Sequence, residues 1–176
     1  MGEALVSVWL ADLDGSVREA RNVNQQHAAG TLGALVARVA EEAGTTPAAV
    51  LEAAGCSPMT ELVVAGGERD LITAHDAARI LAGIAERRLL SASAGDALEQ
   101  ELVGHPERDG IPLGLPEDVL VANHTGLGDG FRHEVALVRP TDRPPFVLAV
   151  LTTGLDEDEA EWRVSELARF LWETAW

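Results

Sequence analysis

The first part of the chain changes from an alternating to a helical pattern of hydrophobic residues. Residues 4–12 alternate as a half-buried strand does, and the pair Asp14-Gly15 predicts a tight turn before a weaker strand over 17–24. Hydrophobic residues then recur at helical spacing over 30–43, and a glycine follows. This part therefore predicts a hairpin followed by a helix.

The middle of the chain has helical spacing and several helix-start signals. Thr46 is suited to cap a short helix that has Pro47 at its first position. Thr73 opens a second helix, predicted to end at Arg88, and Ser93 opens a third that ends at Val103. Residues 56–70 have mixed polarity and two glycines, so we interpret them as a loop.

The last part of the chain returns to strand patterns and ends in a long helix. A proline- and glycine-containing connection over 105–116 precedes predicted strands at 119–123, 133–139 and 145–153. Residues 156–176 form the closing helix, with acidic residues at its positive N-terminal end. Strands on both sides of a helical block indicate an α+β fold whose five-stranded antiparallel sheet joins both ends of the chain.

Composition narrows the class of protein. With 176 residues, 47% hydrophobic, the chain is expected to fold as one domain over residues 1–176. The net charge of −16 argues against nucleic acid or an anionic membrane as a partner, and no hydrophobic run is long enough to span a bilayer. Cys56 is the only cysteine, and the chain has neither lysine nor tyrosine. No side-chain amine or phenol can therefore take part in catalysis.

Four stretches carry a resemblance to a known family. They are VWLADLDGSVREARNVNQQHAAGTLGALVARVA, LITAHDAARILAGIAERRLLS, RDGIPLGLPEDVLVANHTGLGDGFRHEVALVRP and PPFVLAVLTTG. In this order the chain resembles the serine β-lactamase and penicillin-binding-protein superfamily, above all the class A β-lactamase-like hydrolases. The resemblance implies a β-lactamase-like fold with a reduced helical region.

The family's catalytic motifs are changed at the positions where the resemblance places them. Its Ser-x-x-Lys falls on Gly30 to Gly33, and its Lys-Thr-Gly reads His124-Thr125-Gly126. No counterpart of its Ser-Asp-Asn loop is found, and Glu61 lies near the place of its omega-loop glutamate. Acyl-enzyme chemistry needs a nucleophile beside a base that takes its proton. We therefore expect no serine acyl-enzyme activity.

The residues that remain near this predicted cleft suggest binding or acid–base chemistry. His124 is suited to replace the lysine as a donor or general base near neutral pH, with Glu61 as a second catalytic candidate. The alternative is that His124 is a vestigial position at a strand end. The expected ligand-binding residues are Gly30, Thr31, Thr125, Gly126, Arg132 and His133. Thr31 has a structural alternative, in which it caps or packs the helix.

No metal or cofactor is expected. His124, His133 and Asp129 match no recognised ligand spacing, and zinc sites usually need three convergent ligands. The three glycines at 126, 128 and 130 precede a strand, where a phosphate-binding loop would need a helix. Cys56 has no histidine near it in sequence and is more typical of a packed residue than of a nucleophile.

The sequence thus predicts a degenerate β-lactamase-fold protein, a pseudoenzyme with respect to acylation. It would bind a small polar molecule, or transform it by isomerisation, cyclisation, elimination or water addition. The alternative is a non-catalytic interaction protein with a vestigial cleft, and residual hydrolysis is a third possibility. The apolar helix over 30–43 and the pair Trp172 and Trp176 predict a homodimer. Without an export signal we expect a cytoplasmic protein, unless such a segment has been removed.

Overall fold

A five-stranded antiparallel sheet forms the centre of the computed structural model, which describes residues 4–60 and 70–176. Across the sheet the strands are β2 (Val17–Arg21), β1 (Leu5–Asp12), β7 (Phe146–Thr153), β6 (Phe131–Arg139) and β5 (Leu120–Gly128). All of β1 pairs with β7, although the two come from opposite ends of the chain. The predicted α+β class and the sheet built from both ends are confirmed.

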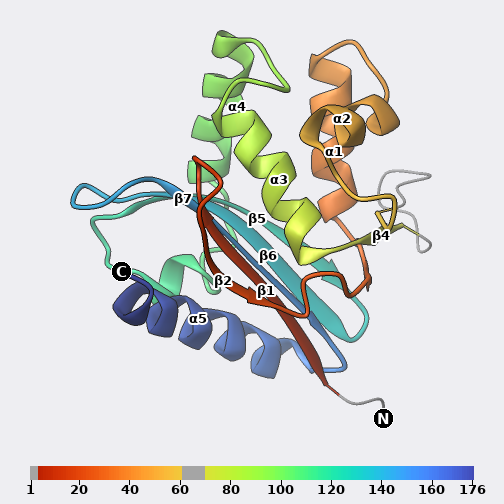
Figure 1. The fold of residues 1–176 in the computed structure, drawn as a ribbon. Coiled ribbons are helices and arrows are strands. Elements are labelled where there is room, and N and C mark those ends of the chain that lie inside the picture. The colour runs from red at the N-terminus through yellow and green to blue at the C-terminus, as the bar shows by residue number, and fades with distance from the viewer. Residues whose placement is uncertain (1–3, 61–69) are drawn as a thin grey trace.

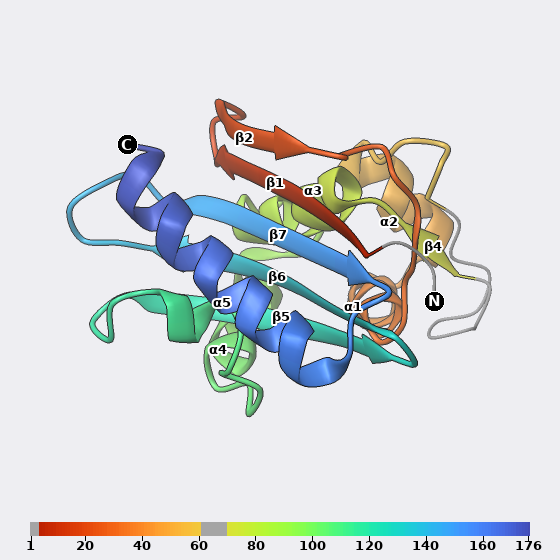
Figure 2. The same ribbon diagram turned by 90° about the horizontal axis from the view of Figure 1, so that it is seen from below.

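Helices cover both faces of the sheet (Figures 1 and 2). One face is covered by α5 (Glu157–Thr174), with the short 3-10 helix η1 (Pro112–Gly114) packed beside it. The helical block on the other face contains α1 (Leu32–Glu42), α2 (Pro47–Ala54), α3 (Ala74–Ala85) and α4 (Ala92–Val103). Each face has its own hydrophobic core, and the central strands β6 and β7 are buried along nearly their whole length because both of their faces are covered.

Helix starts follow the predicted caps in two of three cases. The Thr46 hydroxyl accepts a hydrogen bond from Ala49 N at 3.2 Å, and the Thr73 hydroxyl accepts one from Asp76 N at 3.1 Å. The third prediction was wrong: α4 is capped by Ser91, and Ser93 lies inside the helix. Either serine offers a hydroxyl to the first turn, and local spacing does not distinguish them.

Two further differences concern strands. The predicted strand 119–123 continues as β5 to Gly128, because residues 124–128 pair with β6 instead of forming a wide glycine-rich turn. A small second sheet of β3 (His27–Ala28) and β4 (Leu71–Ile72) was not predicted. These strands are too short to carry an alternating pattern, yet β3 leads the chain directly into α1.

Candidate functional site

The start of α1 lies against the edge strand β5. The Thr31 hydroxyl donates a hydrogen bond to Thr125 O at 2.7 Å, and Leu127 N donates one to Thr31 Oγ1 at 3.3 Å. This close approach needs a glycine at 126, since a Cβ there would lie 2.8 Å from Leu32 Cγ. The structure therefore brings together three of the predicted site residues, Thr31, His124 and Gly126, at one strand edge.

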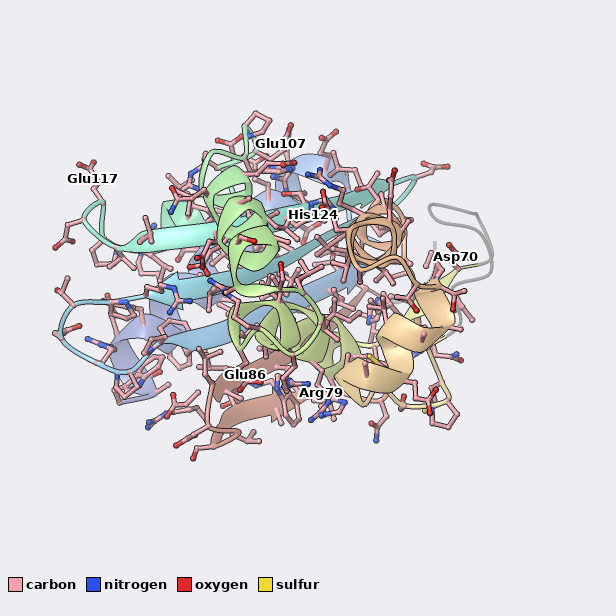
Figure 3. All side chains as sticks on the ribbon, turned by 90° about the horizontal axis from the view of Figure 1, so that it is seen from above. Asp70, Arg79, Glu86, Glu107, Glu117 and His124 are labelled. Atoms are coloured by element: carbon pink, nitrogen blue, oxygen red, sulfur yellow. The ribbon has the colours of Figure 1, made fainter. Side chains whose placement is uncertain are left out.

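His124 lies between α1 and α4, half-buried (Figure 3). Its Nε2 is 3.0 Å from Thr31 O, and because a carbonyl oxygen only accepts, Nε2 carries the proton. Burial lowers the pKa of His124, and the neighbouring His105 lowers it further, while the bond to Thr31 and the charge of Glu101 act the other way. The ring is therefore mostly neutral at pH 7. Its Nδ1 makes no hydrogen bond to any described residue and can accept a proton.

His105 is a neighbour of this site that the sequence analysis did not select. Its ring meets that of His124 edge-on, with centroids 5.6 Å apart, and its Nδ1 accepts a hydrogen bond from Glu107 N at 3.2 Å. No local pattern could have indicated this pairing, because His105 lies two residues after the end of α4 whereas His124 lies within β5.

The space above Gly30 is filled by an aromatic ring. Gly30 has a left-handed φ of +51°, and a Cβ there would lie 2.7 Å from Phe131 Cε2 and 2.8 Å from Leu127 O. Phe131 in turn stacks on the ring of His133 at 4.6 Å. A side chain at residue 30 would thus meet the ring of Phe131, which sequence reasoning did not single out.

Two of the expected ligand-binding side chains face the opposite layer. Strand alternation points Thr125 and Arg132 toward α5, away from His124. The Arg132 guanidinium is buried, 3.6 Å from Glu161 and 3.9 Å from Glu107. Thr125 Oγ1 and two of the three guanidinium nitrogens of Arg132 make no hydrogen bond among the described residues. The expected set is therefore divided between the two faces of the sheet.

His133 is engaged at both ring nitrogens. Its Nε2 donates to Ala28 O at 2.7 Å, and its Nδ1 accepts from Thr152 N at 3.1 Å. Burial lowers its pKa to about 3, so the ring stays neutral at ordinary pH. The His133 ring thus links β3 to β7 through these two hydrogen bonds, and neither ring nitrogen is available to bind a ligand.

Next along β6, Glu134 points into the α5 layer. Its carboxylate accepts hydrogen bonds from Ile111 N and Asn123 Nδ2, each at 2.9 Å. Burial raises its pKa to about 7 despite these bonds and the nearby arginines. The approach of Ile111 N requires a glycine before it, since a Cβ at Gly110 would lie 1.7 Å from Glu134 Oε2.

The second catalytic candidate, Glu61, lies outside the described residues. Within the described part of the chain, no group of three or more histidine, cysteine or acidic side chains is arranged to hold a metal ion. In the same residues, no helix is both long and apolar enough to cross a bilayer. The described site thus consists of a neutral imidazole, a hydroxyl bonded to the main chain and a glycine edge.

This arrangement is poorly suited to nucleophilic catalysis. The proton of the Thr31 hydroxyl is directed to a carbonyl oxygen, which cannot accept it as a base does. The proton on His124 Nε2 is likewise directed to a carbonyl oxygen, and Nδ1 has no partner among the described residues. His124 Nδ1 can therefore accept a hydrogen bond or a proton.

Comparison with known proteins gives consistent matches. The family model described as "Beta-lactamase enzyme family" matches residues 20–175. The structure of PBP-A has a TM-score of 0.85 at 11% identity, covering 98% of this chain and 90% of that one. A β-lactamase from Sphaerobacter thermophilus has a TM-score of 0.78 at 14% identity, covering 97% and 92%. One from Burkholderia ambifaria has 0.74 at 19%, covering 97% and 94%. At these identities the structures show a shared fold, as the sequence resemblance predicts.

Proposed function

This chain belongs to the beta-lactamase enzyme family, and we propose that it uses the family's fold to bind a small polar molecule without forming an acyl-enzyme. The observation that carries the proposal is the contact between Gly30 and Phe131. Gly30 is where the resemblance places the nucleophile, and the space that its side chain would need holds the Phe131 ring. Residue 30 thus carries no nucleophile, and a side chain there would crowd the Phe131 ring and Leu127 O.

The surroundings of Gly30 support the same conclusion. The family's lysine has no equivalent, because the chain contains no lysine at all. Thr31 offers a hydroxyl next in the chain, but its proton is directed to Thr125 O, and among the described residues no base is hydrogen-bonded to it. An activated hydroxyl needs a base within hydrogen-bond reach, at about 2.6–3.2 Å. Non-covalent binding is the role consistent with these contacts.

His124 is the side chain we propose for contact with the molecule. Its neutral ring offers Nδ1 as an acceptor, and His105 lies beside it as a second imidazole. If the bound molecule is transformed, His124 would act as a general base near neutral pH. Reactions that need only proton transfer fit this site, namely isomerisation, cyclisation, elimination or water addition.

Covalent labelling tests the exclusion of acylation. The full chain is incubated with a fluorescent penicillin and with a fluorophosphonate, and intact mass is measured. We expect no adduct, because neither reagent meets an activated nucleophile. An adduct at any residue would contradict the proposal and favour residual hydrolase activity, the third possibility from the sequence.

Ligand screening tests binding. Thermal unfolding of the wild type, of His124→Ala and of Glu117→Gln is measured against a library of small polar metabolites. Glu117 is exposed, lies well away from His124 and serves as the control (Figure 3). We expect compounds that stabilise the wild type and Glu117→Gln but not His124→Ala. Equal shifts in all three proteins would remove His124 from the site.

A non-catalytic interaction protein is the second candidate. It is favoured by one specific observation: Phe131, the Thr31 hydroxyl and His124 Nε2 are all engaged within the protein, as in a closed cleft. A library in which no compound stabilises the wild type would support this role over small-molecule binding.

A further inference from the structure

A cavity of about 410 Å³ lies between α3 and the turn that joins β1 to β2. Its α3 wall is one helix face, since the lining residues recur at positions 75, 78, 79, 82 and 86. Figure 3 shows Arg79 and Glu86 on this side of α3, away from His124. The cavity is therefore separate from the edge of β5, and its volume lies within the range of small-molecule pockets, about 300–1,000 Å³.

The floor of this cavity is apolar and made of small side chains. Ala11, Ala78, Ala82 and Val147 contribute it, and larger residues at these positions would have filled the space. The half-buried indole of Trp9 forms one wall and meets the ring of His75 edge-on, with centroids 4.5 Å apart. An apolar group of a ligand could therefore rest on the alanines against Trp9.

Most of the charged groups that line the cavity already have partners. Asp12 binds the Arg18 guanidinium through both carboxylate oxygens, the shorter distance being 2.5 Å. Glu86 pairs with Arg88 at 2.5 Å. His75 donates through Nδ1 to the Asp76 carboxylate at 2.9 Å, outside the cavity lining. These groups shape the walls, and their charges are largely compensated.

Two lining charges have no ion-pair partner among the described residues. Arg79 is held by a hydrogen bond from its Nε to Ala54 O at 2.8 Å, and it pairs with no carboxylate. Asp14, on the β1–β2 turn, accepts the backbone N–H of Ser16 at 2.9 Å, and its pKa is lowered by hydrogen bonds from Ser16 and, less strongly, by the charge of Arg18. An unpaired arginine is unusual in a chain with 29 acidic and 13 basic residues. Among the described residues, the cavity thus has one cation without an ion pair on its helix wall and one carboxylate without an ion pair on its turn wall.

We propose that this cavity binds a free amino acid with an apolar side chain. The Arg79 guanidinium receives the carboxylate, Asp14 receives the ammonium group, and the side chain lies on the alanine floor against Trp9. A zwitterion matches both of these charges at once, whereas a simple anion or cation leaves one of them unmatched. Charge-assisted hydrogen bonds of this kind are among the stronger polar contacts in proteins.

Titration with L-phenylalanine tests the proposal. The ¹⁵N-labelled full chain is observed by NMR, and the indole N–H signal of Trp9 is assigned with Trp9→Phe. We expect a saturable shift of this signal, and about tenfold or greater weakening with 3-phenylpropionate or phenethylamine, each of which lacks one charge. Absence of a saturable shift at about 10 mM L-phenylalanine would overturn the proposal.

Matched variants locate the contacts. Arg79→Gln and Asp14→Asn are each expected to weaken L-phenylalanine binding about tenfold, while His124→Ala binds as the wild type does. Asp14 lies on an exposed turn, and asparagine keeps the acceptor for Ser16 N, so Asp14→Asn is expected to fold normally. Unchanged affinity in either variant would overturn the assignment of that charge. His124→Ala is the control here, so a failed proposal for this cavity can be distinguished from a failed proposal for the site at the edge of β5.

Discussion

Gly30 is constrained both by its backbone conformation and by a neighbouring ring. It has a left-handed φ of +51°, and a Cβ there would lie closer to the Phe131 ring than van der Waals contact allows. Gly44, just after α1, also has a left-handed φ, of +63°, but a Cβ there would meet nothing within 4 Å. A substitution at Gly44 therefore meets backbone strain alone, whereas one at Gly30 meets both backbone strain and steric crowding.

We predict that Gly30→Ala destabilises the protein more than Gly44→Ala does. The left-handed backbone alone costs a non-glycine residue about 1–2 kcal/mol at either site. Crowding against Phe131 and Leu127 O adds about 1–3 kcal/mol at residue 30. Urea unfolding of both variants measures the difference, and Phe131→Ala should reduce the extra loss at residue 30. Equal losses at the two glycines would contradict the crowding.

Strand β6 connects the two layers of the molecule through consecutive buried residues. His133 points toward β3 and the helical block, and its pKa is lowered by burial to about 3. Glu134 points toward α5, and its pKa is raised by burial to about 7. His27, which pairs with Ser7 and Thr153, resembles His133 in having a pKa lowered to about 4.

These shifts make opposite contributions to the pH dependence of stability. As pH falls below 6.5, the histidine of the unfolded chain gains a proton while folded His133 stays neutral. The contribution of His133 to the free energy of unfolding is therefore complete above pH 6.5 and is lost as pH falls toward 3. Folded Glu134 stays protonated while the unfolded carboxyl, with a pKa of 4.5, ionises. Its contribution is complete below pH 4.5 and is lost as pH rises to about 7.

Between pH 4.5 and 6.5, single substitutions on β6 should therefore change the slope of stability against pH in opposite senses. Glu134→Gln is expected to steepen the rise of unfolding free energy with pH, and His133→Gln to flatten it. Each change is at most about 1.4 kcal/mol per pH unit. Urea denaturation at several pH values provides the measurement. Three parallel curves for the wild type and the two variants would show that neither group has the assigned ionisation.

Two large aromatic side chains are exposed on the outer face of α5. Trp162 is 57% exposed and Phe170 is 51% exposed. Trp172, which the sequence analysis paired with Trp176 as an interface, packs near Phe146 beneath the Arg143 guanidinium, 3.9 Å from its ring centroid. Aromatic residues are enriched in protein interfaces, so the exposed pair suggests a surface for association.

We retain the prediction of a homodimer and place its interface on the outer face of α5. The net charge of −16 opposes association at low salt, so the dimer should tighten as salt rises. Light scattering at low and high salt measures the mass, and Trp162→Gln with Phe170→Gln should weaken the dimer. A monomer mass at micromolar concentration under both salt conditions would refute this prediction.

Much of the architecture could be predicted from local patterns. Alternation indicated β1, other strand patterns indicated β6 and β7, helical spacing indicated α1 and α3, and capping residues placed the starts of α2 and α3. Errors occurred where the local signal was ambiguous or short. Ser91 and Ser93 offer similar caps, and β3 and β4 have two residues each. The candidate site was predicted less well, because strand alternation divides it between two layers.

Composition was enough to exclude the lysine-dependent chemistry of the family, the order of strands and helices indicated the α+β class, and the resemblance implied the family's fold. A residue type is either present or not, and periodicity records which face of an element is buried. Only the tertiary structure placed Phe131 over Gly30, His105 beside His124, and Arg79 opposite the β1–β2 turn in one cavity. Each of these contacts joins segments far apart in the chain, and their approach is decided by how whole layers pack rather than by any local pattern.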